Sequence, residues 1–380
     1  MLANAPWDLA PDLPWRFLTS PASQWAVLPS FAIGECLFIL CAVAALIHAR
    51  RCGRDHLMIW IGALLTGTAN DMIFMALPLV DNFWQAQAMV MLTPRLPLYI
   101  PCVYVCFMYF PTAAVRRLGL GPWSGAALTG LVACGFYAPY DIIGAKFIWW
   151  SWHDTDLPIA ARLLGAPVSS SLWVLTFVGS FARLMHWGLA HDASRHTRGS
   201  FMTGLAIVGG LSTTCMMVQI TVLQQLDGGA PAYWAFGSGL SIYALIVWRG
   251  RANNEPQPRN PHDRLLHAAV VGYFVTLTTI MAVFEPSTHV SAGLHQPPGQ
   301  CYVEAKDITG LTRHKYLCVE DYDEDYTFAC ADSPPADGSR WYTVCGKPHS
   351  SFARWMAGVL ALGTLGVLVF SFLLGPLRRS

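Results

Sequence analysis

The sequence predicts an all-α polytopic membrane protein with about nine transmembrane helices and a small disulfide-stapled extracytoplasmic domain. Three observations predict this class: the composition, a series of long apolar stretches, and the distribution of basic residues between them. Of the 380 residues, 54% are hydrophobic and only 12% are charged, about half of the charged share of a soluble chain. A surface of this composition would aggregate in water, whereas lipid tolerates it. The net charge of +1 gives no electrostatic support for a nucleic-acid partner.

Nine apolar stretches approach the length of about 20 residues that a helix needs to span a bilayer. They lie near residues 27–48, 57–79, 97–115, 123–144, 169–189, 200–223, 232–248, 265–285 and 352–375. No basic segment leads into an apolar run at the start of the chain, so we expect no cleaved secretory signal. We expect residues 1–285 to form a bundle of eight helices, residues 286–351 a Cys-rich loop domain, and residues 352–380 the last helix with a short cytoplasmic tail.

Basic residues follow every odd-numbered stretch. They are Arg50, Arg51 and Arg54 after the first, Arg116 and Arg117 after the third, Arg195 and Arg198 after the fifth, Arg249, Arg251, Arg259 and Arg264 after the seventh, and Arg378 and Arg379 after the ninth. The even-numbered connections are poorer in Lys and Arg, with Arg95, Lys146 and Arg162 as exceptions. Because cytoplasmic loops carry the excess of basic residues, the N-terminus and the Cys-rich loop are predicted to be extracytoplasmic and the C-terminus cytoplasmic. His48 and His56 flank the first cytoplasmic connection and Cys52 lies in it, and we expect no special role for them.

The segment 286–351 differs in kind from the rest of the chain. It is polar and carries four cysteines, Cys301, Cys318, Cys330 and Cys345. Disulfides persist on the extracytoplasmic side, and four cysteines allow three pairings, among which the sequence does not choose. A domain this small has little core of its own, so we expect a small β-rich fold that depends on its disulfides.

Three carboxylates lie inside predicted spans: Glu35 in the first, Asp71 in the second and Asp141 near the outer end of the fourth. Ionisable groups inside a bilayer are costly, so each is a candidate functional residue. Glu35 and Asp71 lie about eight residues from the outer end of their helices, which is roughly 12 Å deep at 1.5 Å per residue. Each could instead bond a neighbouring helix as packing. Their common depth favours a shared site, with the three residues as acids or bases.

A dense cluster of aromatic and polar residues follows the fourth stretch. It runs Trp149-Trp150-Ser151-Trp152-His153-Asp154-Thr155-Asp156, with Arg162 soon after. An interfacial aromatic belt followed by a solvated loop is one interpretation, and a functional site is the other. His153, Asp154 and Asp156 could bind a divalent metal, although no known metal-binding spacing is present and no cofactor is evident. Alternatively, a buried neutral carboxylic acid could protonate an alkene, and tryptophan faces could stabilise the resulting carbocation.

The order of residues from the first to the fifth stretch forms a pattern. It consists of Glu35, Arg50-Arg51, an acidic residue in the second stretch, Pro97-Leu98-Tyr99-Ile100-Pro101, Tyr140-Asp141, Trp149-Trp150-Ser151-Trp152 and Gly165-Ala166-Pro167-Val168-Ser169. Over residues 30–180 this order resembles the carotenoid-biosynthesis hydratases, integral membrane proteins that add water to the end of an isoprenoid chain. The resemblance implies Glu35, Asp71 and Asp141 as catalytic acids.

A second resemblance covers most of the chain. The Trp-Trp-x-Trp-His-Asp-Thr-Asp run and the Cys-rich loop resemble an uncharacterised multi-pass membrane family, which implies no activity. The residues His153–Asp156 and the segment 286–351 depart from the hydratase pattern.

The leading hypothesis is an integral membrane enzyme that acts on a lipid or isoprenoid-type substrate near the outer leaflet, with membrane lipid as its partner. The candidate catalytic residues are Glu35, Asp71, Asp141, His153, Asp154 and Asp156, and the candidate substrate-binding residues are Asn70, Tyr99, Trp149, Trp150, Trp152 and Arg162. Two alternatives remain. One is a transporter or channel that couples ions through the buried carboxylates, and the other is a receptor-like protein that binds a partner through the Cys-rich domain.

Overall fold

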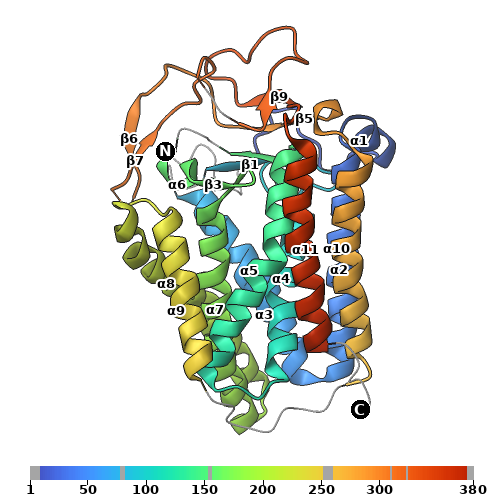
Figure 1. Cartoon of the computed structure of the whole chain (residues 1–380), viewed down its shortest axis with the longest axis vertical. Coiled ribbons are helices and arrows are strands. Elements are labelled where there is room, and N and C mark those ends of the chain that lie inside the picture. Colours follow the sequence, from blue (N-terminus) through green and yellow to red (C-terminus); the bar gives the residue numbers. More distant parts are fainter. Residues whose placement is uncertain are drawn as a thin grey trace.

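A bundle of long helices makes up most of the molecule (Figure 1). The computed structural model describes residues 9–77, 82–152, 156–250, 260–308, 310–321 and 324–374. The long helices are α2 (Pro29–Cys52), α3 (Arg54–Ala76), α4 (Tyr99–Arg116), α5 (Pro122–Lys146), α7 (Val168–Arg195), α8 (Arg198–Leu223), α9 (Tyr233–Arg249), α10 (Asp263–Val283) and α11 (Phe352–Leu374). Shorter helical segments are α1 (Pro21–Val27), α6 (Leu157–Ala160), η1 (Gln224–Asp227) and η2 (Pro286–Thr288).

Seven helices in the described ranges are long and apolar enough to cross a membrane. The sequence predicts nine spanning helices, but α4 and α9 do not meet this criterion of length and hydropathy. α9 has 17 residues, or about 25 Å at 1.5 Å per residue. α4 carries three tyrosines and two prolines, and nearly all of its side chains are buried against α2, α3 and α5. Because protein surrounds α4, its sequence need not be as apolar as that of a lipid-facing helix.

Local sequence explains where several helices begin and end. Pro29 and Pro122 occupy the first turns of α2 and α5, where a missing N–H costs nothing. Gly53 has a φ of +99°, a conformation that glycine adopts without strain, and it joins α2 directly to α3. Thr197 and Ser200 form a capping box at the start of α8.

Glycines allow two of the predicted tryptophans to lie deep in the interior. A Cβ on Gly34 would lie 2.5 Å from the ring of Trp149, and one on Gly144 would lie 2.1 Å from the ring of Trp150. Both indoles are buried. The structure therefore places Trp149 and Trp150 in the core, and an interfacial aromatic belt does not describe them.

Residues 286–351, here called the cap, cover one end of the bundle (Figure 1). The described part of the cap contains a three-stranded antiparallel sheet in the order β5–β9–β8 and a hairpin of β6 and β7. The strands are β5 (Val290–Leu294), β6 (Glu304–Lys306), β7 (Thr312–His314), β8 (Tyr326–Thr327) and β9 (Trp341–Gly346). Disulfides join Cys301 to Cys318 and Cys330 to Cys345, a pairing that the sequence left open. The cap is thus β-rich and stapled, as the sequence predicts.

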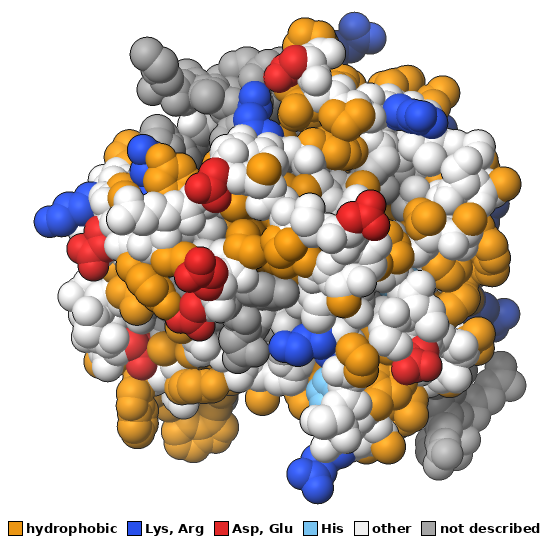
Figure 2. Space-filling view, turned by 90° about the horizontal axis from the view of Figure 1, so that it is seen from above, with side chains coloured by type: hydrophobic (Ala, Val, Ile, Leu, Met, Phe, Trp, Pro, Cys, Tyr) orange, Lys and Arg blue, Asp and Glu red, His pale blue; other side chains and the backbone are white. Residues whose placement is uncertain are grey.

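The cap is attached to the bundle by main-chain and side-chain contacts. β1 (Phe83–Gln85) pairs with β2 (Trp150–Trp152), and Ala86 then bridges to Gly293 of β5. A second small pair is formed by β3 (Arg162–Leu163) and β4 (Ala166–Pro167). Ion pairs between bundle and cap are Lys146–Asp325 at 2.7 Å, Arg162–Glu324 at 3.1 Å and Asp156–Arg313 at 2.6 Å. Seen from above, the cap end shows acidic and basic side chains interspersed with apolar ones (Figure 2), as expected for a surface in water.

Candidate functional site

A cavity of about 220 Å³ lies between the cap end of the bundle and the cap itself. Its wall is mostly apolar and aromatic, with a few polar groups, which is typical of small-molecule sites. Helices α3, α4, α5, α7 and α8, strands β1 and β2, and the cap all contribute to it. The lining side chains that the argument uses are Asn70, Asp71, Tyr104, Tyr137, Tyr140, Trp150, Trp152, Ser169, Ser170, Trp173, Met217, Ile220, Asp307 and Arg313.

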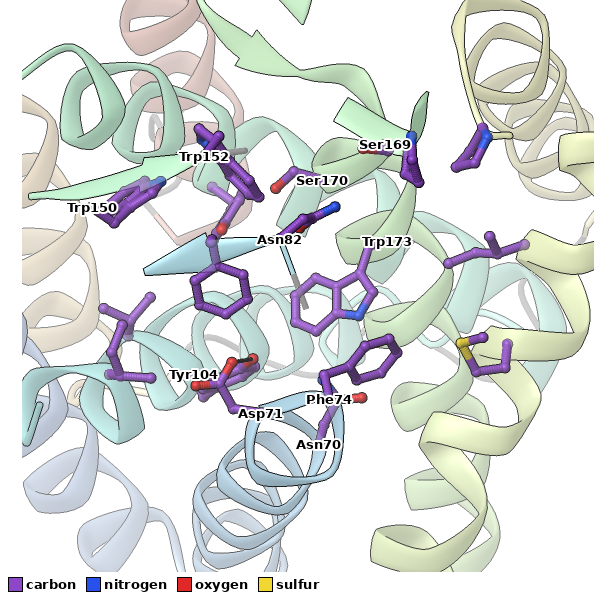
Figure 3. A pocket seen from close by; sticks show the side chains of 18 of the residues that line it. Asn70, Asp71, Phe74, Asn82, Tyr104, Trp150, Trp152, Ser169, Ser170 and Trp173 are labelled. Atoms are coloured by element: carbon purple, nitrogen blue, oxygen red, sulfur yellow. Dashed lines mark hydrogen bonds between the residues drawn. The ribbon is translucent and has the colours of Figure 1, made fainter. Parts of the chain in front are cut away.

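Asp71 is the carboxylate that lines this cavity from within the bundle. It lies on α3, is 5% exposed, and accepts a hydrogen bond of 2.9 Å from the Tyr104 hydroxyl of α4. Tyr104 in turn packs closely on α3, since a Cβ on Gly67 would lie 2.3 Å from its ring. The neighbouring Asn70 accepts a hydrogen bond of 2.9 Å from Thr213 of α8. These contacts fix Asp71 at the cavity wall beside aromatic rings (Figure 3).

Asp141 lies behind the same wall. Its carboxylate on α5 is buried and does not line the cavity, but the hydroxyl of Tyr137, which does, lies 3.4 Å from its Oδ1 atom. Of the three predicted carboxylates, Asp71 lines the cavity, and Asp141 contacts a residue that lines it.

Glu35 is directed elsewhere. Both of its carboxylate oxygens lie 3.0 Å from the backbone N–H of Met89, which donates to them. Glu35 thus holds the chain that follows β1 against α2, and it does not line the cavity. Glu35 does not join the other carboxylates at the cavity, because the backbone N–H of Met89 donates to its carboxylate instead. The hydropathy pattern does not reveal this backbone segment between the helices.

Three tryptophans contribute to the wall of the cavity (Figure 3). Trp150 and Trp152 come from β2, and Trp173 comes from the first turns of α7. The Nε1 atom of Trp152 is buried and has no hydrogen-bond partner among the described residues. A buried N–H normally has an acceptor, so a ligand with an oxygen atom would satisfy this group.

The cap closes the cavity with charged residues. Arg313 of β7 contacts Asp156 of the bundle at 2.6 Å and Asp307 of the cap at 3.2 Å, and all three side chains are nearly inaccessible to solvent. Arg313 and Asp307 line the cavity, whereas Asp156 does not. Asp156 therefore joins the bundle to the cap through an ion pair with Arg313.

A histidine of the cap makes a second buried contact with β2. His295 Nδ1 lies 2.9 Å from the Ser151 hydroxyl, and the ring stacks on Tyr342 of β9 at 4.4 Å. Burial lowers the pKa of His295 from 6.5 to about 3, since a charged imidazolium would lose its hydration there. The neutral ring is therefore part of the cap interface near neutral pH.

The remaining predicted residues have structural contacts. Trp149 donates to the Ser30 hydroxyl at 2.9 Å, Tyr99 donates to Gln85 at 2.6 Å, and Arg162 pairs with Glu324 of the cap. None of these three predicted substrate-binding residues lines the cavity, whereas Asn70, Trp150 and Trp152 do. His153 and Asp154 lie outside the described residues, and so does the metal site predicted from them.

Several cavity residues were not among the predicted site residues. Ser169, Ser170 and Trp173 lie on one turn at the start of α7, a polar and aromatic group at helical spacing that could have indicated a site. Tyr104, Asp307 and Arg313 carry no such signal, because their positions depend on helix packing and on the way the cap folds back.

The fold and the cavity together define a polytopic α-helical membrane protein with a disulfide-stapled cap over a largely apolar site. Residues 18–374 match the family model described as Domain of unknown function (DUF7802). The chain belongs to this family, whose function is not established. No curated protein and no solved structure matches the chain.

Proposed function

We propose that this protein is a membrane-embedded enzyme that acts on a lipid or isoprenoid-type substrate in the cavity beneath the cap. The observation that carries the proposal is the position of Asp71, a buried carboxylate on the wall of a largely apolar, aromatic cavity. An ionisable group at such a depth is costly and marks a functional site. Apolar walls suit a hydrocarbon chain, and Asp71 suits acid–base chemistry on it.

The reaction that fits these groups is hydration of a carbon–carbon double bond. Asp71 in its acid form gives its proton to one alkene carbon, and the π electrons form the new C–H bond. The faces of Trp150, Trp152 and Trp173 stabilise the carbocation at the other carbon. A water oxygen then forms the C–O bond, and the proton that it releases returns to Asp71. The largely apolar and aromatic wall of the cavity supports an isoprenoid alkene as the substrate class.

A route from the lipid to the cavity is part of the proposal. Met217 and Ile220 of α8 line the cavity, whereas Val218 and Val222 of the same helix are 60% and 66% exposed. α8 thus faces the cavity on one side and the outer surface of the bundle on the other. We infer that a substrate chain enters beside α8 from the bilayer and places its end near Asp71.

The orientation follows from the basic residues together with the cap. We infer that all nine long helices span the membrane, with the cap and the N-terminus outside and the C-terminus in the cytoplasm. Arginines of the first, third and fifth connections lie at the end opposite the cap, which is the arrangement that the positive-inside rule favours. Because the cap contributes a wall of the cavity, we propose that it is a lid over the site and not an independent receptor domain.

The test compares lipid turnover by the wild type with turnover by Asp71→Asn. The substitution keeps the size of the side chain and its bond to Tyr104 but removes the acid, so we expect turnover to fall by at least 100-fold, in line with general acid–base catalysis of about 10²–10⁴-fold. The matched control is Asp332→Asn, an exposed carboxylate of the cap, which should keep full activity. The assay is untargeted mass spectrometry of membrane lipids with each variant expressed at equal levels. A lipid profile that is the same for wild type and Asp71→Asn would overturn the proposal.

A further inference from the structure

A second group of reactive side chains lies at the end of the bundle opposite the cap. His48 and Cys52 are four residues apart on one face of α2, and His56 lies in the first turn of α3, in the spacing His-x₃-Cys-x₃-His. Gly53 at φ +99° reverses the chain between them. One ligand atom from each of the three lies within 4.8 Å of the other two. None of these residues lines the cavity beneath the cap.

The distances within this cluster suit a transition-metal ion. Cys52 Sγ lies 3.4 Å from His48 Nε2. A tetrahedral zinc site with Zn–N of about 2.0–2.1 Å and Zn–S of about 2.3 Å separates two such ligand atoms by about 3.5 Å. The observed spacing is therefore close to that of two ligands of one ion, with no rearrangement of α2.

Tyr109 of α4 orients both imidazole rings. Its hydroxyl oxygen lies 2.7 Å from His48 Nδ1 and 3.2 Å from His56 Nδ1. If each Nδ1 carries its proton, the phenolic oxygen can accept both hydrogen bonds, and each Nε2 keeps a lone pair for a metal. Ligating histidines commonly donate their second ring N–H in this way, which fixes the tautomer and the ring orientation.

Asp263 of α10 could supply a fourth ligand. Asp263 Oδ1 lies 3.1 Å from His48 Nε2, and its second oxygen is held by Arg117 at 3.1 Å. An ion between His48 and Asp263 would replace the direct contact between Nε2 and Oδ1. Three helices, α2, α3 and α10, would then supply the ligands.

The arginines that line the cavity beside the cluster are paired with acidic residues. This polar cavity of about 320 Å³ adjoins the cluster and is lined by Cys52, His56 and Asp263 together with arginines. Each arginine has an acidic partner: Arg54 with Asp192 at 2.5 Å, Arg116 with Asp55 at 3.0 Å, and Arg117 with Asp263 at 3.1 Å. The paired arginines therefore do not exclude a cation, and the cavity provides a polar path to the site.

We propose that His48, Cys52 and His56 bind one zinc-class transition-metal ion, with Asp263 as the fourth ligand. A thiolate with two imidazoles selects zinc or a similar metal over magnesium and calcium, which prefer oxygen ligands. Binding releases the thiol proton of Cys52, because the thiolate is the ligand. This site is independent of the proposed lipid chemistry and stands or falls separately from it.

The experiment measures metal in the full-length protein purified in detergent, by elemental mass spectrometry after loading with Zn²⁺ and removal of free metal. We expect about one equivalent in the wild type. Cys52→Ser and His56→Asn should lose at least ten-fold in Zn²⁺ affinity, since even the loss of a residue that only orients a ligand typically costs 10–100-fold. The matched control Cys215→Ser, an exposed free cysteine on α8, should bind like the wild type.

A Co²⁺ titration of the metal-free wild type gives a readout that needs no variant to fold. We expect d–d bands of tetrahedral cobalt together with a thiolate charge-transfer band. Absence of the thiolate band, or Zn²⁺ binding that Cys52→Ser leaves unchanged in a protein with wild-type helix content, would overturn the proposal. Lipid turnover by Asp71→Asn does not enter this test, so the two proposals can fail separately.

Discussion

Replacing Arg313 by methionine should loosen the cap from the bundle. Arg313 contacts Asp156 at 2.6 Å across the cap interface and Asp307 at 3.2 Å within the cap, and the side chains of the three are only 3–5% exposed. Arg313→Met fills a similar volume but removes the positive charge. Two carboxylates then remain at a buried site without their guanidinium.

The size of the effect follows from the burial. Removing one partner of a buried ion pair costs about 3–5 kcal/mol, because the charge left behind is no longer compensated. At about 1.4 kcal/mol per factor of ten, the equilibrium for opening the cap should shift by about 100- to 5,000-fold. Combining Arg313→Met with Asp156→Asn removes one of the stranded charges and should recover part of this loss.

Hydrogen exchange of backbone amides measures the opening directly, since native-state exchange reports local opening free energies. Peptides covering β5 and β7 of the cap and β2 of the bundle should exchange faster in Arg313→Met, while those of α4 in the core should not change. Lys306→Met, an exposed position on neighbouring β6, is the control and should stay within about 0.5 kcal/mol of the wild type. Unchanged exchange in β5 and β7, or equal acceleration everywhere, would refute the ion pair as the anchor of the cap.

Three further predictions concern the site, the cap and the orientation. Gly67→Ala should destabilise the bundle by about 1–3 kcal/mol and reduce activity, because its Cβ would lie 2.3 Å from the Tyr104 ring. The control Gly135→Ala, with open space around it, should change neither stability nor activity. Thermal unfolding and lipid turnover measure the two effects. The free energy of opening the cap should fall as the pH drops from 6.5 towards 3, because in this range His295 takes up a proton in the detached cap but not in the docked cap. The loss should be about 2 kcal/mol at pH 5, measured by hydrogen exchange. An equal loss in His295→Gln would exclude this residue as the cause. A membrane-impermeant maleimide should label Lys306→Cys on intact cells, and labelling only after permeabilisation would reverse the proposed orientation.

Much of the fold was predictable from the hydropathy of the chain. The nine apolar stretches correspond to the nine long helices of the described ranges, because a helix core must match the thickness of the bilayer whatever its neighbours are. The number of helices that span the membrane does not follow from hydropathy alone. α4 is surrounded by other helices and carries three tyrosines, so hydropathy alone does not distinguish a central helix from a marginal one.

The candidate site was predictable only in part. The depth of Asp71 along its helix could be predicted, since 1.5 Å per residue fixes the level of a side chain, and Asp71 does line the cavity, whereas Asp141 does not. The direction in which each side chain points from its helix could not be predicted from the sequence, because it depends on how the helices pack. Glu35 lies at a similar depth to Asp71 but bonds the backbone of Met89, and Asp156 turned out to pair with Arg313, 157 residues further along the chain.

The residues of the proposed metal site were visible in the sequence but were not predicted to form a site. The spacing of His48, Cys52 and His56 is visible in the sequence, yet these residues were expected to have no special role because they flank a connection between helices. The tight reversal at Gly53 and the hydroxyl of Tyr109 bring the three together. Neither contact follows from hydropathy, although the regular spacing of three possible metal ligands was a signal.

The most direct test of the central claim is the source of the oxygen in the product. Membranes containing the wild-type protein are incubated in water enriched in oxygen-18, and the lipids are analysed by mass spectrometry. Hydration at Asp71 predicts one lipid alcohol that carries a single oxygen-18 atom with the wild type and is missing with Asp71→Asn. No labelled lipid with the wild type, or the same labelled lipid in equal amount with Asp71→Asn, would contradict the claim that this carboxylate hydrates a lipid in the cavity.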